Sequence, residues 1–175
     1  MTAQLWLQAD GWNRFSGLVH GFSGRLQDRT ATLSGPGMAG LPLSTLKQVH
    51  GDDIVVISRY DRDDKKPEAD GMITTETGIL LGIATADCVP VLIIAPEKKL
   101  VAALHAGWRG TLKGISVRAV ETLATHWEVK PKHLWVALGP AIGGCCYEVG
   151  REVGEVLYQR WGTSSPSAWK PAGAK

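Results

Sequence analysis

The sequence predicts a mixed α/β domain, and two kinds of hydrophobic pattern lead to this fold class. Three apolar runs of strand length follow one another at 79–86, 89–95 and 100–105. Their apolar residues are continuous rather than alternating, which is typical of strands in a sheet covered on both faces. From residue 111 onward the apolar residues recur at helical spacing, which predicts a helix that covers one of those faces. We therefore expect an α/β (α+β) architecture with at least five strands and two helices.

The first half of the chain supplies loops and the first strands. The stretch 20–42 is rich in Gly, Ser, Thr and Pro and is interpreted mostly as loop. A strand is predicted at 53–58, and the charged run 59–70 is most simply a solvated turn or loop. The segment 71–74, GMIT, is a further short strand.

The apolar segment 79–96 has the length of a membrane helix but not its composition. It carries a single charge, Asp87, which lies with Pro90 near its middle. Both residues oppose a membrane helix, and the two flanks each have strand length. The segment therefore predicts two buried strands joined at 85–88.

The last third of the chain combines helices with one more strand. An amphipathic helix of about four turns is predicted at 111–127, followed by a strand at 133–138 and a loop at 139–150. A second helix is predicted from one apolar stripe, and the tail 162–175 is interpreted as unstructured. The residues of that stripe are Val149, Val153, Val156, Leu157 and Trp161.

The composition indicates which class of partner the protein binds and in which compartment it is found. The chain has 175 residues, 44% hydrophobic and 21% charged, which suits a single domain spanning 1–175. Its net charge of +2 is too small to suggest nucleic-acid binding, so we expect a small-molecule partner. Three cysteines do not suggest a disulfide scaffold, and no secretory signal is recognised, so a cytoplasmic protein without a membrane span is predicted.

The segment LVAALHAGWRGT predicts an anion site. It leads from a buried strand through Gly107 to the start of the best predicted helix, where free N–H groups favour a negative charge. Arg109 is placed to assist by bidentate hydrogen bonding, and Gly110 permits close approach of a ligand. The alternative is that Arg109 only pairs with an acidic surface residue.

Three separate residues at strand edges or turns predict a metal site. His50 precedes a strand, Cys88 lies in the joint between two apolar runs, and His105 ends a buried strand. Two imidazoles and a thiolate, with a fourth position left for water or substrate, are typical of catalytic zinc. Considered without the other two residues, Cys88 would be interpreted as a small core residue and His50 as a surface residue. Asp87 lies beside Cys88, between strands expected to be interior, where an unpaired charge is costly.

The remaining cysteines and histidines give weaker signals. Cys145 and Cys146 are adjacent, which is awkward for an ordinary disulfide, so both are expected to be reduced thiols in a tight loop. His20, His126 and His133 show no shared pattern and are expected to be structural.

In this order the motifs closely resemble the laccase-domain (YfiH-like) family, formerly described as multicopper polyphenol oxidases. The matching segments run from His20 to Gly150: HGFSGR, LKQVHGDD, ADGMIT, ATADCVPVLI, AALHAGWRGT and LGPAIGGCCYEVG. The resemblance implies a layered α/β/β/α sandwich with zinc held by His50, Cys88 and His105. It further implies a purine nucleoside phosphorylase acting on adenosine, inosine, guanosine or methylthioadenosine, with adenosine deaminase activity.

The implied activities agree with the residues found above. Zinc lowers the pKa of water, which suits attack on C6 of adenine, and Arg109 with Gly110 would hold the phosphate that attacks the ribose C1′. Asp87 is expected to transfer a proton beside the metal. Family members have a longer stretch between HGFSGR and QVHG and continue well beyond the second helix, so this chain is expected to lack a C-terminal segment. A monomer or a homodimer is expected.

Three other functions remain open from the sequence. A copper-dependent polyphenol oxidase usually needs His-x-His pairs, and the five histidines of this chain form none, although copper binds most nitrogen and sulfur sites more tightly than zinc. A metal-free cysteine hydrolase would use Cys88 as nucleophile and His105 as base, and would suit an amidase acting on cell-wall precursors. A structural zinc domain that serves as an interaction module is the non-enzymatic alternative.

Overall fold

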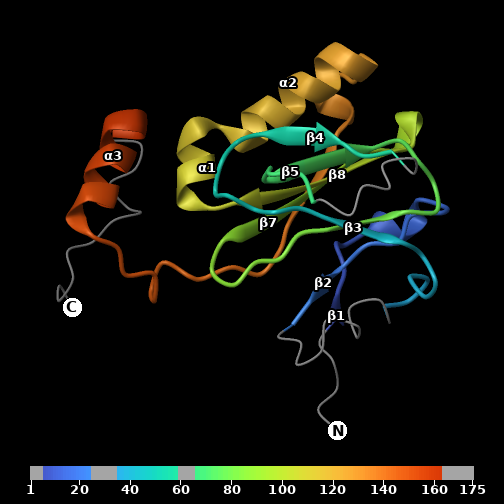
Figure 1. Cartoon of the computed structure of the whole chain (residues 1–175), viewed down its shortest axis with the longest axis horizontal. Coiled ribbons are helices and arrows are strands. Elements are labelled where there is room, and N and C mark those ends of the chain that lie inside the picture. The colour runs from blue at the N-terminus through green and yellow to red at the C-terminus, as the bar shows by residue number, and fades with distance from the viewer. Residues whose placement is uncertain (1–5, 25–34, 59–65, 163–175) are drawn as a thin grey trace, which may run out of the picture.

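A computed structural model of the chain describes residues 6–24, 35–58 and 66–162 (Figure 1). Within these residues, eight strands come before two α-helices, and a ninth strand and a third α-helix follow, which confirms the mixed α/β class. The strands are β1 (Trp6–Leu7), β2 (Phe22–Ser23), β3 (Leu43–Thr45), β4 (Ile54–Val56), β5 (Gly71–Thr74), β6 (Leu80–Gly82), β7 (Val89–Ala95), β8 (Leu100–Ala106) and β9 (Trp135–Leu138). The helices are α1 (Trp108–Lys113), α2 (Ile115–Trp127) and α3 (Arg151–Trp161).

A five-stranded mixed sheet forms the centre of the molecule. Its strands lie in the order β4-β5-β8-β7-β9, with β4 and β5 parallel and every other pair antiparallel. β7 and β8 form a hairpin closed by the short 3₁₀ turn Pro96–Lys98, where Lys99 adopts a left-handed conformation (φ 50°). The apolar runs 89–95 and 100–105 therefore became long adjacent strands, as predicted.

Both faces of this sheet are covered, which explains the continuous apolar pattern. Met72 and Ile73 are adjacent on β5 and both fully buried, yet they belong to two separate hydrophobic clusters. Ile73 packs in the larger cluster with residues of α2, including Leu123. Met72 packs on the other face with Leu46. Because neighbouring strand residues point to opposite faces, a strand buried on both sides must be apolar throughout.

The helix predicted at 111–127 is two helices that meet at a glycine. Gly114 ends α1 and begins α2 with φ of 90°, a left-handed conformation that residues with a Cβ rarely adopt. α1 also begins earlier than predicted, at Trp108. Figure 1 shows α1 and α2 along one face of the central sheet, where Ile115 and Ala119 are fully buried.

The two strands predicted within 79–96 lie in different sheets. β7 belongs to the central sheet, whereas β6 is shorter than the predicted 79–86 and pairs in parallel with β3. Strand β3 was not predicted from the sequence, because this short strand directly follows the Gly-, Ser- and Pro-rich stretch 20–42. None of the helices in the described part of the chain combines the length and apolar character that a membrane crossing requires.

The C-terminal part of the described chain is more open than the sheet. β9 is an edge strand whose residues Val136 and Leu138 are exposed. The predicted second helix is present as α3, which stands apart from the sheet at the end of a long connection (Figure 1). Of the predicted stripe, Val153 is buried but Val156 is 43% exposed.

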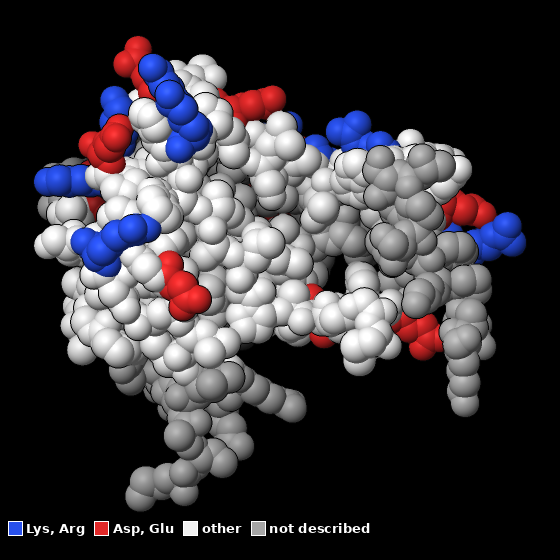
Figure 2. All heavy atoms as spheres, turned by 180° about the vertical axis from the view of Figure 1, so that it is seen from behind, with Lys and Arg blue, Asp and Glu red and all other residues white. Residues whose placement is uncertain are grey.

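Two loop predictions are partly tested. The stretch 20–42 contains the short strand β2, and its residues 25–34 lie outside the described residues, as do 59–65 and the tail from 163. The end of the charged run is not solvated, because Asp70 is completely buried. On the face drawn in Figure 2, cationic and acidic side chains are interspersed. The layered α/β/β/α arrangement and the single-domain extent remain expectations.

Candidate metal centre

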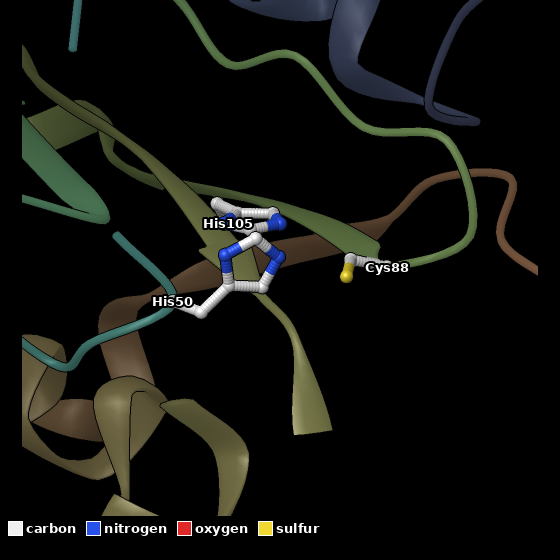
Figure 3. A group of neighbouring side chains, drawn as sticks. All are labelled: His50, Cys88 and His105. Carbon is white, nitrogen blue, oxygen red and sulfur yellow. The ribbon is translucent and has the colours of Figure 1, made fainter. Parts of the chain in front are cut away.

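Three side chains from three separate segments meet at one end of the central sheet. The ligand-capable atoms of His50, Cys88 and His105 all lie within 4.8 Å of one another. The two imidazole rings are 4.8 Å apart between centroids and nearly perpendicular, at 79°. Figure 3 shows both rings and the Cys88 thiol gathered in one place. The convergence assumed from the sequence is therefore present in the structure.

Each of the three residues is held by a different element. His105 lies near the end of β8, opposite Pro90 of β7, and is buried. Cys88 immediately precedes β7 and is half-buried. His50 is exposed, lies in the loop before β4, and has a left-handed backbone with φ of 59°. That conformation is uncommon for a residue with a Cβ and must be maintained by its surroundings.

Asp70 is the main residue of the site that sequence reasoning missed. Its side chain is fully buried, and Oδ1 lies 2.7 Å from Nδ1 of His105. Oδ1 also accepts from the backbone N–H of His50 at 3.0 Å, while Oδ2 accepts from those of Val49 at 3.1 Å and Gly51 at 2.6 Å. The available signal was its position: it directly precedes the buried strand β5, where a solvated acid is not expected.

The charge of Asp70 is stabilised despite burial. Burial alone would raise the pKa of this carboxyl, but hydrogen bonds from His105 and from the backbone N–H groups of Gly51, Val49 and His50 together lower it. The opposite holds for Cys88, whose thiol pKa is raised by burial and by the negative charges of Asp87 and Asp70. Without a nearby cation, Cys88 is therefore held in its thiol form.

Two glycines allow the segments around the site to approach closely. A Cβ on Gly107 would lie 3.1 Å from the Cys88 sulfur and 3.2 Å from Cδ2 of His50, tighter than most real contacts. A Cβ on Gly110 would lie 2.5 Å from the carbonyl oxygen of Gly51. Packing thus explains why glycine occupies both positions, and phosphate binding by Gly110 stays a prediction.

The donor set fits a transition metal of the zinc type. Two imidazoles and one thiol provide three ligand atoms of the kinds that zinc prefers, close enough to share one ion. Nδ1 of His105 is hydrogen-bonded to the carboxylate of Asp70, which leaves Nε2 for a metal. Metal-bound histidines commonly have a carboxylate hydrogen-bonded to the other ring nitrogen in this way. Copper accepts the same donors, so the geometry supports a metal site without identifying the metal.

Arg109 and Asp87, the other predicted catalytic residues, are both exposed near this end of the sheet. The guanidinium of Arg109 lies over the Trp108 ring, 4.3 Å from its centroid, and it forms no ion pair with any residue that the structure describes. Asp87 does not occupy the interior position that the sequence suggested. Its backbone carbonyl accepts from Ile142, which brings the 139–150 loop beside the segment that carries Cys88.

The remaining cysteines and histidines lie outside the three-residue cluster. Cys145 and Cys146 are exposed free thiols with sulfurs 3.1 Å apart, which agrees with the expected reduced pair. His20 is buried beside Trp12 and accepts from the backbone N–H of Ala9.

Comparison with known proteins places the chain in a family. The model of the family described as multi-copper polyphenol oxidoreductase laccase matches residues 27–173. The chain belongs to this family. It is 40% identical over 131 residues to a protein of Geobacillus stearothermophilus named purine nucleoside phosphorylase YlmD, covering 71% of this chain and 48% of the relative. It is 32% identical over 114 residues to human purine nucleoside phosphorylase LACC1, covering 65% of this chain and 25% of the relative.

Solved structures in the family share this fold. The crystal structure of YlmD from Geobacillus stearothermophilus aligns with a TM-score of 0.68 and 38% identity, over 75% of this chain and 51% of that one. Bacillus licheniformis YfiH aligns with a TM-score of 0.62 and 34% identity, over 66% and 46%. The chain thus spans about half the length of these bacterial proteins. The family resemblance inferred from the sequence motifs is confirmed.

Proposed function

We propose that this protein is a zinc-dependent purine nucleoside phosphorylase that also deaminates adenosine. The observation that carries the proposal is the convergence of His50, Cys88 and His105 within 4.8 Å, in a chain whose relatives are named purine nucleoside phosphorylases. Adenosine, inosine, guanosine and methylthioadenosine are the proposed nucleosides. The proposed setting is the cytoplasm, with a small-molecule substrate and no nucleic-acid or membrane partner.

In this proposal His50, Cys88 and His105 would hold the metal. A set of three protein ligands would leave a fourth position for water or substrate. When bound, zinc supplies Lewis acidity and lowers the pKa of water near neutral pH. Asp70 fixes the His105 ring by accepting from Nδ1, which leaves Nε2 free to bind.

Arg109 is the proposed phosphate-binding residue. Its exposed guanidinium is already oriented against Trp108, and no carboxylate among the described residues occupies it. A planar guanidinium binds phosphate through two parallel hydrogen bonds. Phosphate held there would attack C1′ of the ribose while the bond from C1′ to the purine nitrogen breaks. The purine leaves with a proton, and ribose 1-phosphate remains.

Asp87 is the proposed proton-transfer residue. It precedes the ligand Cys88 in sequence and its carboxyl is exposed, so it can exchange protons with solvent. In deamination, water adds at C6 of the purine and ammonia leaves. A carboxylate beside the metal would take the proton from the attacking water and return it to the leaving amine.

The cysteine hydrolase alternative is disfavoured by the environment of Cys88. A nucleophilic cysteine usually has a lowered pKa, maintained by a cation or a helix N-terminus. Here burial and two carboxylates raise the thiol pKa. A metal ion beside Cys88 would reverse this effect and stabilise the thiolate.

The proposal is tested by product analysis on the zinc-loaded protein. The protein is incubated with adenosine or inosine, with and without phosphate, and bases, ribose 1-phosphate and inosine are measured by chromatography. We expect phosphate-dependent release of adenine and hypoxanthine, together with inosine formed from adenosine. Arg109→Ala should weaken the phosphate dependence, whereas Arg151→Ala on α3 should not. A zinc-loaded protein that forms none of these products would overturn the proposal.

A further inference from the structure

Asp70 connects both histidines of the metal centre through one buried carboxylate. It contacts His105 through the ring, at Nδ1, and His50 through the backbone, at N–H. These two histidines come from β8 and from the loop before β4, which are far apart in the sequence. We propose that Asp70 is a positioning residue that prepares the two histidines for the metal before it binds. This inference rests on the metal centre of the proposed function.

The ring contact selects one tautomer of His105. An ionised carboxylate only accepts, so the hydrogen between Oδ1 and Nδ1 belongs to the ring nitrogen. With the proton on Nδ1, the lone pair of a neutral ring lies on Nε2. Both residues are almost completely buried, with exposed side-chain fractions of 4% for His105 and 0% for Asp70, so water does not compete for this contact. His105 is therefore ready to ligate through Nε2.

The backbone contacts hold the loop that carries His50. Three successive N–H groups, from Val49, His50 and Gly51, point to the two oxygens of Asp70. The middle residue of this triplet has the left-handed φ of 59°. Such a conformation is unfavourable for a residue with a Cβ and persists only when neighbouring interactions fix it. The carboxylate supplies that fixation and thereby directs the His50 side chain toward Cys88.

Both oxygens of Asp70 are needed as acceptors, which makes Asp70→Asn an informative substitution. If the amide nitrogen replaced Oδ1, it would face Nδ1 of His105 and the N–H of His50. His105 would then move its proton to Nε2 and lose the metal-binding lone pair. If the nitrogen replaced Oδ2, it would face the N–H groups of Val49 and Gly51 and release the loop. Either orientation damages one of the two ligands.

The test compares zinc affinity in the full chain by competition with a chromophoric chelator. Asp70→Asn should weaken zinc binding by about 10–100-fold, the range seen when partners of metal-bound histidines are removed. The matched control is Glu68→Gln, an exposed acid two positions away that pairs with Lys47. It should bind zinc as the wild type does. All affinities are measured at a temperature below the unfolding transition of every variant, so that loss of folded protein does not lower the measured zinc binding.

A second measurement uses the wild-type protein and does not depend on the variant folding. Nitrogen NMR of the zinc-free protein, recorded at a pH where the His105 ring carries a single proton, should place that proton on Nδ1. A proton on Nε2, or wild-type zinc affinity in a folded Asp70→Asn protein, would overturn the inference. Neither result involves nucleosides. The protein could prove inactive on nucleosides while its zinc affinity still depends on Asp70. That result would refute the proposed function and leave the inference on Asp70 intact.

Discussion

The metal-centre end of the sheet and the C-terminal arm, residues 139–161, are built in opposite ways. Around the metal centre, His105 and Asp70 are buried and two glycines permit contacts that a Cβ would prevent. In the arm, residues 143–148 are exposed, and α3 buries only Val153 and Gly154 against described residues. The difference indicates that the candidate metal centre is held mainly by the sheet and its adjoining loops. The arm touches this end of the sheet at its start, where Gly139 and Ile142 donate to the carbonyls of Pro90 and Asp87. Substitutions in the two regions should therefore have very different effects.

The largest difference should appear in stability. Leu104→Ala removes a fully buried side chain of β8 and should lower the free energy of unfolding by about 2–5 kcal/mol. Val156→Ala, on the exposed part of α3, should change it by about 0.5 kcal/mol or less. Denaturant titration followed by circular dichroism measures both. Equal losses would show that the arm packs as tightly as the sheet.

The glycines beside the ligands should affect metal binding more than folding. Gly107→Ala is compatible with its backbone (φ −73°) but places a Cβ against Cys88 and His50. We expect about tenfold weaker zinc binding, the lower end of the cost of disturbing a ligand's support. Gly144→Ala, in the arm, meets no atom within 4 Å and serves as the control. Unchanged zinc affinity in Gly107→Ala would contradict the described packing.

Removing a surface ion pair should change the stability of the protein in both regions, but the difference between the regions should be smaller than in the preceding predictions. Arg118 of α2 pairs with Asp52 at 3.2 Å and Asp53 at 3.1 Å, just after the His50 loop. Arg151 pairs with Glu155 at 2.9 Å within α3. Arg118→Gln should cost about 0.5–1 kcal/mol and Arg151→Gln about 0.3 kcal/mol, since exposed pairs contribute little. Thermal unfolding at low and high salt measures both, and a larger cost for Arg151→Gln would reverse the order.

The smallest predicted effect concerns pH and lies outside both regions, at His20. Burial lowers the pKa of this histidine, so the folded protein favours the neutral ring. The unfolded chain has an ordinary histidine pKa of about 6.5. Stability is thus fully present above that value and decreases as the pH falls toward the lowered pKa. His20→Gln, which retains an acceptor for the Ala9 N–H, should flatten the dependence of stability on pH below about pH 6.5. Parallel profiles of variant and wild type would contradict this explanation.

Hydrophobic pattern predicted the central fold because burial on both faces leaves a local signal. The strands β7 and β8 were recognisable from continuous apolar runs alone. The break at Gly114 was missed, because helical spacing continues across it and one residue's left-handed φ leaves no mark on that spacing. The pairing of β6 with β3 was also missed, because strand pairing depends on contacts distant in the sequence.

The three residues of the candidate metal centre could be predicted from the sequence, but the residue that supports them could not. His50, Cys88 and His105 were identified from their residue types and their positions at strand edges or turns. Asp70 was assigned to a charged, solvated run because composition averages over neighbours. Its burial becomes visible only when β5 pairs with β8 and brings it to His105. The role of Arg109 is tested by the Arg109→Ala variant described above, and the roles of Asp87 and Gly110 stay predictions.

The most direct test of the account is the zinc content of the purified protein and of two cysteine variants. We predict that wild-type protein binds a single zinc ion per chain, measured by atomic emission and by the anomalous signal of a crystal at the zinc edge. Cys88→Ser should lose tight binding of that ion. The double variant Cys145→Ser, Cys146→Ser should retain it, because those exposed thiols lie outside the cluster. Zinc content that is unchanged by Cys88→Ser, or that is lost in the double variant, would contradict the account.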